Sequence, residues 1–454
     1  MGLLQFLQRI EPDKKKSPLL HTAYDAFFTF AFTPNTVTKG GVHIRDGMDL
    51  KRLMVYVVLA LQLCYLFGSY NIGHQHFVAA GQHLGFLDAF HLKLAHGLIK
   101  MLPMFIVTHV VGLGIEFLFV AKKGHAVEEG FLVSGALIPL IMPPDLPMWI
   151  LALSVTFAVI LGKEAFGGTG MNIWNIALLA RVFVFFAYPT EISGDTCWVS
   201  GYDSLAAGSA AEYGWWHTGF FNSIFGSLGW PQFDAAKTVV VDGFSGATPL
   251  ALAYQGGMEA VNQHYSIGQI FWGAIPGSIG ETNKPFIILG ALFLIFTRVA
   301  SWRIMAGMVL GVGVTGLLFN AWGFNAFMMV PWYYHYILGS FLFAMAFKVS
   351  AAPFHFWTPD VYDGAPTVFT SFMATIVKVV VFFGFIRLFD DMFEPQQGQW
   401  RLWVTVITAV TLFIGNITAV FQQSVKRMLA YSSIAQAGFM LFALYAMSGD
   451  GKEG

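Results

Sequence analysis

Long apolar segments recur along the chain and limit the folds that it can adopt. A bilayer core of roughly 30 Å is crossed by about 20 apolar residues in a helix. The chain has 454 residues, 11% of them charged, and a mean hydropathy of +0.62, whereas soluble domains are about 25% charged. These features predict an all-α polytopic membrane protein with about 11 apolar segments, some short or broken. The segments are about 52–70, 101–120, 130–143, 147–162, 171–188, 285–300, 304–321, 332–347, 366–388, 402–422 and 430–447.

The segment 130–143 is shorter than the others and ends in Met-Pro-Pro-Asp. It could be a half-helix, or one arm of a tightly turned hairpin with 147–162. Broken helices are tolerated in membranes where they line a cavity inside the protein. Both interpretations stay open from the sequence.

Basic residues in short loops predict the orientation. If the N-terminus is cytoplasmic and five spans precede residue 189, then 189–284 lies on the outer face, where turn signals predict little regular structure. The net charge of −1 gives no reason to expect a nucleic-acid partner. The basic residues are Lys14, Lys15, Lys16, Lys51, Arg52, Lys122, Lys123, Lys163, Arg298 and Arg303.

Histidines gather in the first predicted external loop, 71–100. A metal or haem site is one interpretation, but no acid or cysteine completes a ligand set, so a polar amphipathic loop without metal is favoured. The histidines are His74, His76, His83, His91 and His96. The two cysteines, Cys64 and Cys197, do not form a Cys-x-x-Cys motif, so we expect no iron–sulfur cluster held by this chain alone.

The stretch DGFSGATPLA, residues 242–251, is polar and glycine-rich within an apolar chain. Thr248 has no neighbouring base in the sequence, so it is a poor catalytic nucleophile. It is either an acceptor modified by another enzyme or part of a surface turn, and residue chemistry alone favours the turn. If this stretch is an acceptor loop, Gly243 and Gly246 would let its backbone bend. Asp242 could then position a metal-bound donor.

The sequence around Thr248 resembles a known family. DGFSGAT resembles the D-G-x-[ST]-G-A-T signature at which a flavin transferase attaches FMN to threonine. The chain from residue 1 to about 347 resembles the B subunits of the Na+-translocating NADH:quinone reductases. The similar stretches are 33–54, 127–149, 163–195, 275–281, 300–307 and 329–347.

This resemblance implies a function and an environment. Thr248 would carry FMN through a phosphoester, in an acceptor loop that includes Asp242, Gly243, Ser245 and Gly246. Riboflavin would be held non-covalently, ubiquinone would be the electron acceptor, and NADH oxidation would drive Na+ export. The partners would be the other subunits of the complex, a flavin transferase and membrane lipid. We expect the bacterial inner membrane, with a cytoplasmic N-terminus and Thr248 on the periplasmic side.

Further candidate residues lie in or near the spans. Glu116 is an intramembrane carboxylate, which favours an ion-pathway role; the alternatives are an arginine partner or a side chain that snorkels to the cytoplasmic end. Gly112 matches the first glycine of a family pair associated with the quinone site, but Leu113 replaces the second. The glycines of FGGTG could contact a flavin or allow close helix packing; they are Gly167, Gly168 and Gly170.

The C-terminal part resembles a different family. Residues 347–389 and 415–440 resemble the antiporter-like N subunit of complex I, where Lys348 and Lys378 would be proton-relay lysines. Helices expected of both families are missing at the junction. The chain is therefore either a natural fusion or two genes joined during sequence assembly, and the missing helices favour an artefactual or degenerate join.

These observations predict five regions. They are a cytoplasmic segment 1–51, a membrane bundle 52–188, an external region 189–284 with the flavin acceptor, a truncated bundle 285–347, and an antiporter-like fragment 348–454. We expect a flavin-carrying subunit of a redox-driven Na+ pump, with no catalytic residue of its own. One alternative is the D-type membrane subunit of the related electron-transport complex to ferredoxin. Another, of a different class, is a passive ion channel or a proton antiporter component using the tail lysines.

Overall fold

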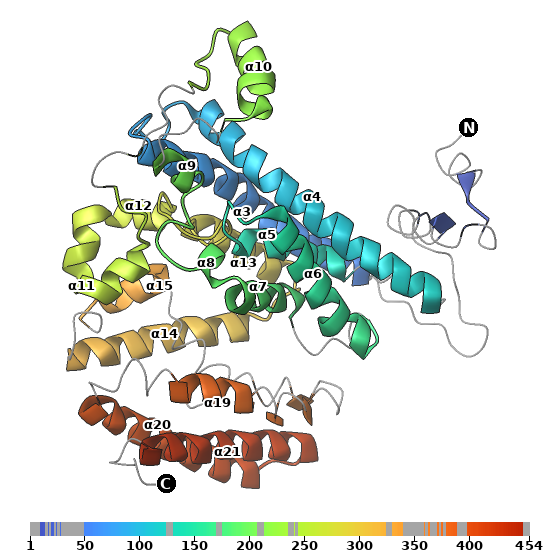
Figure 1. The fold of residues 1–454 in the computed structure, drawn as a ribbon. Helices are drawn as coiled ribbons and strands as arrows, with labels where there is room; N and C mark the ends of the chain where they lie inside the picture. Colours follow the sequence, from blue (N-terminus) through green and yellow to red (C-terminus); the bar gives the residue numbers. More distant parts are fainter. Residues whose placement is uncertain are drawn as a thin grey trace. The chain divides into compact units, whose positions relative to one another are not determined.

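In the computed structural model, the regular secondary structure of the described residues is helical, and turns and irregular loops join the helices (Figure 1). The chain divides into two compact units, Met1–Pro249 with Tyr265–Ala300, and Leu250–His264 with Ser301–Gly454. The predicted five-region division stays a prediction. The described residues are 10–13, 17, 20–21, 24, 28, 50–123, 130–168, 175–206, 213–234, 240, 244–323, 329–338, 358, 362–363, 370–371, 374–375, 378–387 and 397–447.

The first unit is built on a group of apolar helices. Its main helices are α3 (Leu50–Ala79), α4 (Phe90–Lys123), α5 (Phe131–Ile141), α6 (Met148–Gly162), α7 (Ile176–Ala187) and α13 (Lys284–Phe296). In the described part of the chain, three apolar helices are long enough to cross a bilayer, over Arg52–Ala79, Phe90–Lys122 and Met148–Phe166. Four shorter apolar helices include α5, α7 and α13. A polytopic membrane protein is therefore confirmed in outline, and the number of spans stays a prediction.

Helix α5 corresponds to the short segment 130–143. At 1.5 Å a residue its 11 residues span about 16 Å, roughly half of the bilayer core. It packs against α3, α4 and α7, and the Tyr65 hydroxyl of α3 donates a hydrogen bond to the Ala136 carbonyl. The structure therefore favours the half-helix interpretation over a hairpin whose arms pack on each other.

Helices α3 and α4 contact each other more closely than most helix pairs. Gly73 of α3 faces the backbone of Lys93, and Gly97 of α4 faces the backbone of Ser69, so that a Cβ at either glycine would overlap main-chain atoms. Small residues allow such an approach between membrane helices, where van der Waals packing replaces the hydrophobic effect. Figure 1 shows the two helices side by side.

The predicted loop 71–100 is longer than the connection in the structure. Helix α3 continues to Ala79 and α4 begins at Phe90, which leaves only 80–89 as the connection. The hydropathy window ended the first span near residue 70 because histidines follow. The rings of His76 and His96 are buried against neighbouring side chains instead of facing water, so both helices continue through them.

The expectation of little regular structure in 189–284 is also wrong. The region contains α8 (Pro189–Ile192), α9 (Tyr202–Ala206), a π-helix (Trp216–Phe221), α10 (Asn222–Ser227), α11 (Pro249–His264) and α12 (Ile267–Trp272). Turn signals at 193–201 are real, but the apolar residues at 213–233 pack on the ends of α3 and α4 and stabilise helical turns there.

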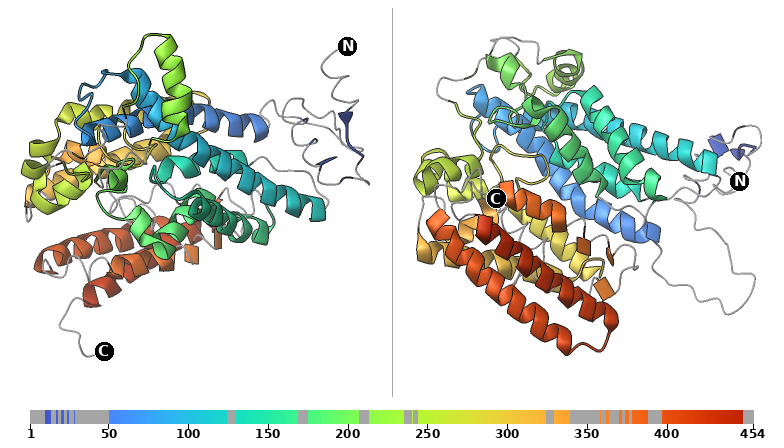
Figure 2. Two further views of the ribbon diagram at one scale, coloured as in Figure 1. Left: turned by 45° about the horizontal axis from the view of Figure 1, so that its top comes forward. Right: turned by 60° about the horizontal axis from the view of Figure 1, so that its bottom comes forward.

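The second unit contains α14 (Trp302–Trp322), α15 (His335–Leu338), α19 (Lys378–Arg387), α20 (Gln397–Val420) and α21 (Val425–Met447). Helices α20 and α21 form a closely packed pair, which Figure 2 shows in two further views. Gly415 of α20 faces the backbone of Ala435, and a core of Phe382, Val404, Ala437 and Leu441 joins α19 to this pair.

The glycine contact between α3 and α4 predicts a difference between two substitutions in one helix. Gly97→Ala would place a methyl group on the Ser69 backbone, and such overpacking typically costs about 1–3 kcal/mol. Gly114→Ala, also in α4, meets no atom within 4 Å and should be neutral or stabilise the helix by about 0.5–1 kcal/mol. Thermal unfolding in detergent checks this, and equal midpoints for the two variants would contradict it.

Candidate functional site

The loop that carries Thr248 is fixed on two sides. The rings of Phe244 and Tyr202 lie 6.4 Å apart. Gly246 is buried so close to the Asp195 carbonyl that a Cβ would overlap it. The loop therefore needs glycine at 246 to lie against the 195–202 segment. The Ala247 amide donates to Ser245 Oγ (3.2 Å).

Tyr265 holds the other side of the loop. Its hydroxyl donates a 2.9 Å hydrogen bond to the Ala247 carbonyl. Burial, and secondarily the charge of Asp195, raises the pKa of Tyr265 above its ordinary value, so the phenol keeps its proton and remains a donor. Thr248 follows as a partly exposed residue directly before Pro249, the first residue of α11. Asp242 and Gly243 lie outside the described residues.

Cys197 lies in the neighbouring segment 193–201, and its environment keeps the thiol protonated. Its thiol donates to the Gly194 carbonyl at 3.2 Å. Burial raises the pKa of this thiol to about 11, so little thiolate is present at neutral pH. Both cysteines are free thiols, and Cys64 is buried in α3.

Glu116 forms a buried ion pair with Lys163. Glu116 is 1% exposed and Lys163 is 2% exposed, and Lys163 Nζ contacts Glu116 Oε1. Neither alternative in the sequence interpretation holds, because the partner is a lysine and the carboxylate does not reach the helix end. Glu116 Oε2 is buried without a hydrogen-bond partner in the described part of the chain. In the sequence, Lys163 was interpreted only as a topology signal. Its position at the end of an apolar segment was the feature that could have indicated a buried partner.

The glycines after Lys163 close the turn that presents this lysine. Gly167 and Gly168 have φ angles of 115° and 107°, in the left-handed region that side chains disfavour. The Gly168 amide donates to the Lys163 carbonyl at 3.2 Å. These two glycines thus have a backbone role, and their contact with a flavin stays a prediction. Gly170 lies outside the described residues.

Gly112 lies where α4 meets α5. A Cβ on Gly112 would overlap the Phe131 ring. Packing alone therefore explains a glycine at this position. Its assignment to a quinone site stays a prediction. Glu281, by contrast, precedes α13 by three residues and contacts Ser278 Oγ and, at 3.9 Å, Arg181.

Buried histidines join α3 and α4 to residues near Ser200 and His217. The rings of His76 and His96 stack with centroids 4.0 Å apart. His217 Nε2 lies 3.1 Å from His96 Nδ1, and His96 Nε2 lies 3.1 Å from Ser200 Oγ. The Ser200 hydroxyl donates onward to Asp145 Oδ1 at 3.3 Å. With neutral rings, this chain of groups has one donor and one acceptor at each step.

The charge state of His217 agrees with that assignment. Desolvation, and secondarily the charges of His76 and Lys100, lower the pKa of His217 to about 4, so the ring is neutral at pH 7. Lys100 pairs with Asp145 at 2.7 Å at the end of the chain of hydrogen bonds. In the described residues, no group of three or more histidine, cysteine or acidic side chains is arranged to hold a metal ion. No local pattern in the sequence pointed to Ser200, Asp145 or His217 in this network.

Lys378 is buried in the second unit. It is 1% exposed, and its Nζ donates to the Ser433 carbonyl (2.7 Å) and to Ser433 Oγ (2.8 Å). This lysine therefore connects α19 to α21. Lys348, the other predicted relay lysine, lies outside the described residues.

Comparison with known families decides where the chain belongs. The profile of the NQR2, RnfD, RnfE family matches residues 37–356. The chain belongs to this family. A second profile, that of the NADH:quinone oxidoreductase/Mrp antiporter transmembrane family, matches residues 289–454. Both sequence resemblances are thus confirmed, and the two matched ranges overlap over 289–356.

Curated relatives support the family assignment. The chain is 39% identical over 372 residues to the B subunit of the Na(+)-translocating NADH-quinone reductase of Chromohalobacter salexigens, covering 77% of this chain and 81% of the relative. It is 36% identical to the proteins of the same name from Pseudomonas aeruginosa, over 375 residues, and Haemophilus influenzae, over 383 residues. In each of these two comparisons 77% of this chain and 83% of the relative are covered.

The buried Glu116–Lys163 ion pair predicts that a single and a double substitution differ in stability. Lys163→Met alone leaves Glu116 charged, buried and unpaired, which typically costs about 3–5 kcal/mol. The double variant K163M/E116L removes both charges and should recover most of that loss, because apolar replacements of buried pairs are often neutral. Thermal unfolding in detergent measures both. Equal destabilisation by the single and the double variant would contradict the coupling.

Proposed function

We propose that this chain is the flavin-carrying membrane subunit of a redox-driven Na+ pump, and that Thr248 is the attachment point of FMN. The observation that carries the proposal is the Thr248 loop. A partly exposed threonine follows a backbone held by Gly246, Ser245 and Tyr265. It lies in a chain whose relatives are named as B subunits of a Na+-translocating NADH-quinone reductase.

The loop suits covalent attachment of a phosphate. A modifying enzyme needs access to the Thr248 hydroxyl, and the partial exposure of this residue supports such access. The firm backbone on either side fixes the anchor, so that the position of the attached group depends on its own linker. Bound FMN would supply one-electron chemistry that no side chain of this chain offers. The fold contributes the anchor and its position.

Glu116 is the proposed ion-pathway residue. Its carboxylate is buried within α4 and one oxygen, Oε2, lacks a partner in the described residues. Carboxylate oxygens are hard ligands that suit small cations, and intramembrane carboxylates mark ion pathways. The proposal also includes riboflavin held in the membrane, a quinone site near Gly112, the other subunits as partners, and a bacterial inner-membrane location with Thr248 on the periplasmic side.

A second candidate is the D-type membrane subunit of the related complex that exchanges electrons with ferredoxin. The matching family description includes RnfD as well as NQR2. The names of the similar curated proteins favour the quinone reductase type. Electron donor assays separate the two, because only the quinone reductase type would accept electrons from NADH and pass them to quinone in the purified complex.

The flavin proposal predicts a covalent mass change. When the chain is expressed with a flavin transferase, the tryptic peptide that begins at Thr238 should gain about 438 Da, the mass of FMN less water. Thr248→Ala should abolish both the added mass and the yellow-green fluorescence of the band on a denaturing gel. Thr196→Ala, at an exposed threonine in the neighbouring segment, should retain both. An unmodified peptide from an active complex would sink the proposal.

A second prediction concerns the C-terminal lysine. Lys378→Ala removes two hydrogen bonds to Ser433, and such bonds typically contribute about 0.5–1.5 kcal/mol each. We expect less assembled protein but unchanged NADH:quinone turnover per covalent flavin in vesicles. Lys426→Ala, at an exposed position of α21, is the control and should assemble normally. A large loss of turnover at normal assembly for Lys378→Ala would mean that the tail takes part in coupling.

A further inference from the structure

We propose that residues 213–233, the aromatic segment, form a membrane-interface anchor. Its partner is the headgroup region of the lipid bilayer on the side where α3 ends and α4 begins. The segment comprises the π-helix Trp216–Phe221, α10 (Asn222–Ser227) and their flanks. It is independent of the Thr248 loop and of the Glu116–Lys163 pair.

The composition of the aromatic segment is unusual for a region outside the spans. Residues 214–233 contain no Asp, Glu, Lys or Arg, although they contain three tryptophans and four phenylalanines. A helical segment that is purely water-exposed normally carries charges on its outer face. Tryptophan is enriched where a protein crosses the boundary between lipid and water, because indole combines a large apolar ring with one N–H donor.

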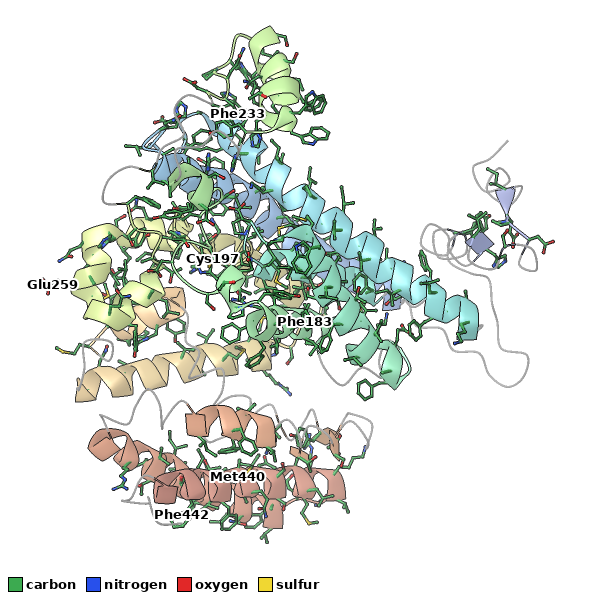
Figure 3. All side chains as sticks on the ribbon, in the orientation of Figure 1. Phe183, Cys197, Phe233, Glu259, Met440 and Phe442 are labelled. Carbon is green, nitrogen blue, oxygen red and sulfur yellow. The ribbon has the colours of Figure 1, made fainter. Side chains whose placement is uncertain are left out.

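One face of the segment fixes it to the membrane helices. Tyr213, Phe225 and Phe233 pack with Phe77 of α3 and Leu92 of α4. The same face brings His217 Nε2 to 3.1 Å from His96 of α4. A histidine at the start of α4, His91, donates to the Pro231 carbonyl at 3.0 Å. Figure 3 labels Phe233 below the α10 helix, where the segment meets α3 and α4.

The opposite face is apolar and exposed. Trp215 is 66% exposed and Trp216 is 56% exposed, and the Trp216 ring contacts Phe220 at 5.5 Å. The remaining exposed members are Phe220, Ile224 and Leu228, which follow Trp216 at every fourth position. Trp230 is also half-exposed, and one side of its ring lies against His91, with ring centroids 5.1 Å apart. Since the inner face is already occupied, these side chains need another apolar partner. An exposed contiguous patch of this kind marks an interaction surface.

The depth of the segment matches a lipid interface. The rise along α4 from His96 to Lys122 is about 39 Å at 1.5 Å a residue. A bilayer with its headgroups is about 40–45 Å thick. With Lys122 and Lys123 in the headgroups of one side, His96 and the aromatic segment beside it reach the headgroups of the other. A tilt of about 20°, ordinary for membrane helices, changes this rise by only a few ångströms.

Quenching of tryptophan fluorescence tests the anchor. The protein is purified with its co-purifying subunits and placed in phosphatidylcholine nanodiscs, with or without lipid brominated near the carbonyl end of the acyl chains. Subtracting the emission of the W215F/W216F variant from that of the unaltered protein gives the emission of Trp215 and Trp216. We expect most of it to be quenched by brominated lipid and little of it by aqueous iodide. Trp198, half-buried and facing Arg181, gives the comparison variant W198F, whose lost emission should be quenched less by brominated lipid than that of the exposed Trp215 and Trp216.

Two results would overturn the anchor. Quenching of the Trp215 and Trp216 emission by iodide alone would place the patch in water. Emission insensitive to both quenchers would mean that another protein covers it. W230F, measured in the same way, provides an independent readout at a site that requires no change to the Trp215–Trp216 pair, so the test remains decisive if the double variant assembles poorly.

Discussion

The close contact between α3 and α4 determines how the rest of the first unit is arranged. Gly73 and Gly97 let the two backbones approach, and this approach brings the rings of His76 and His96 to 4.0 Å. The same contact makes the surface on which residues 213–233 fold. At the other end of α4, a third glycine receives the Phe131 ring of the half-helix α5. A single helix pair thus organises both residues 213–233 and the packing of the half-helix α5.

Parts of this arrangement follow from sequence pattern. Hydropathy located α14, α20 and α21 to within about five residues at each end, because apolar segments of bilayer length have few alternatives to a helix. It also marked the short segment that became α5. Hydropathy ended α3 and began α4 in the wrong places, because His76 and His96 were interpreted as loop residues. Their polar atoms are satisfied by Ser200, Tyr213 and His217, which come from distant positions in the chain.

The polar residues show the same limit of prediction from local sequence patterns. Thr248 was singled out from a local motif, since the loop that presents it is contiguous, and its role as an acceptor stays a prediction. The Glu116–Lys163 pair could not be found in this way, because it depends on how α4 and α6 align along the membrane normal. Gly112 was singled out for a quinone site, and Gly167 and Gly168 for a flavin contact or close packing, yet each has a sufficient steric or backbone reason to be glycine. A motif thus identifies a residue type at a position more reliably than it identifies the purpose of that residue.

Pro249 has a consequence for anything attached to its neighbour. A residue that precedes proline is largely excluded from the helical region and held extended, and Pro249 itself has a fixed φ. Thr248 is followed by this rigid ring and preceded by a carbonyl that Tyr265 holds. The main chain at the proposed attachment point is therefore restrained on both sides. The radius over which a tethered group could search would then be set by the tether's own rotatable bonds.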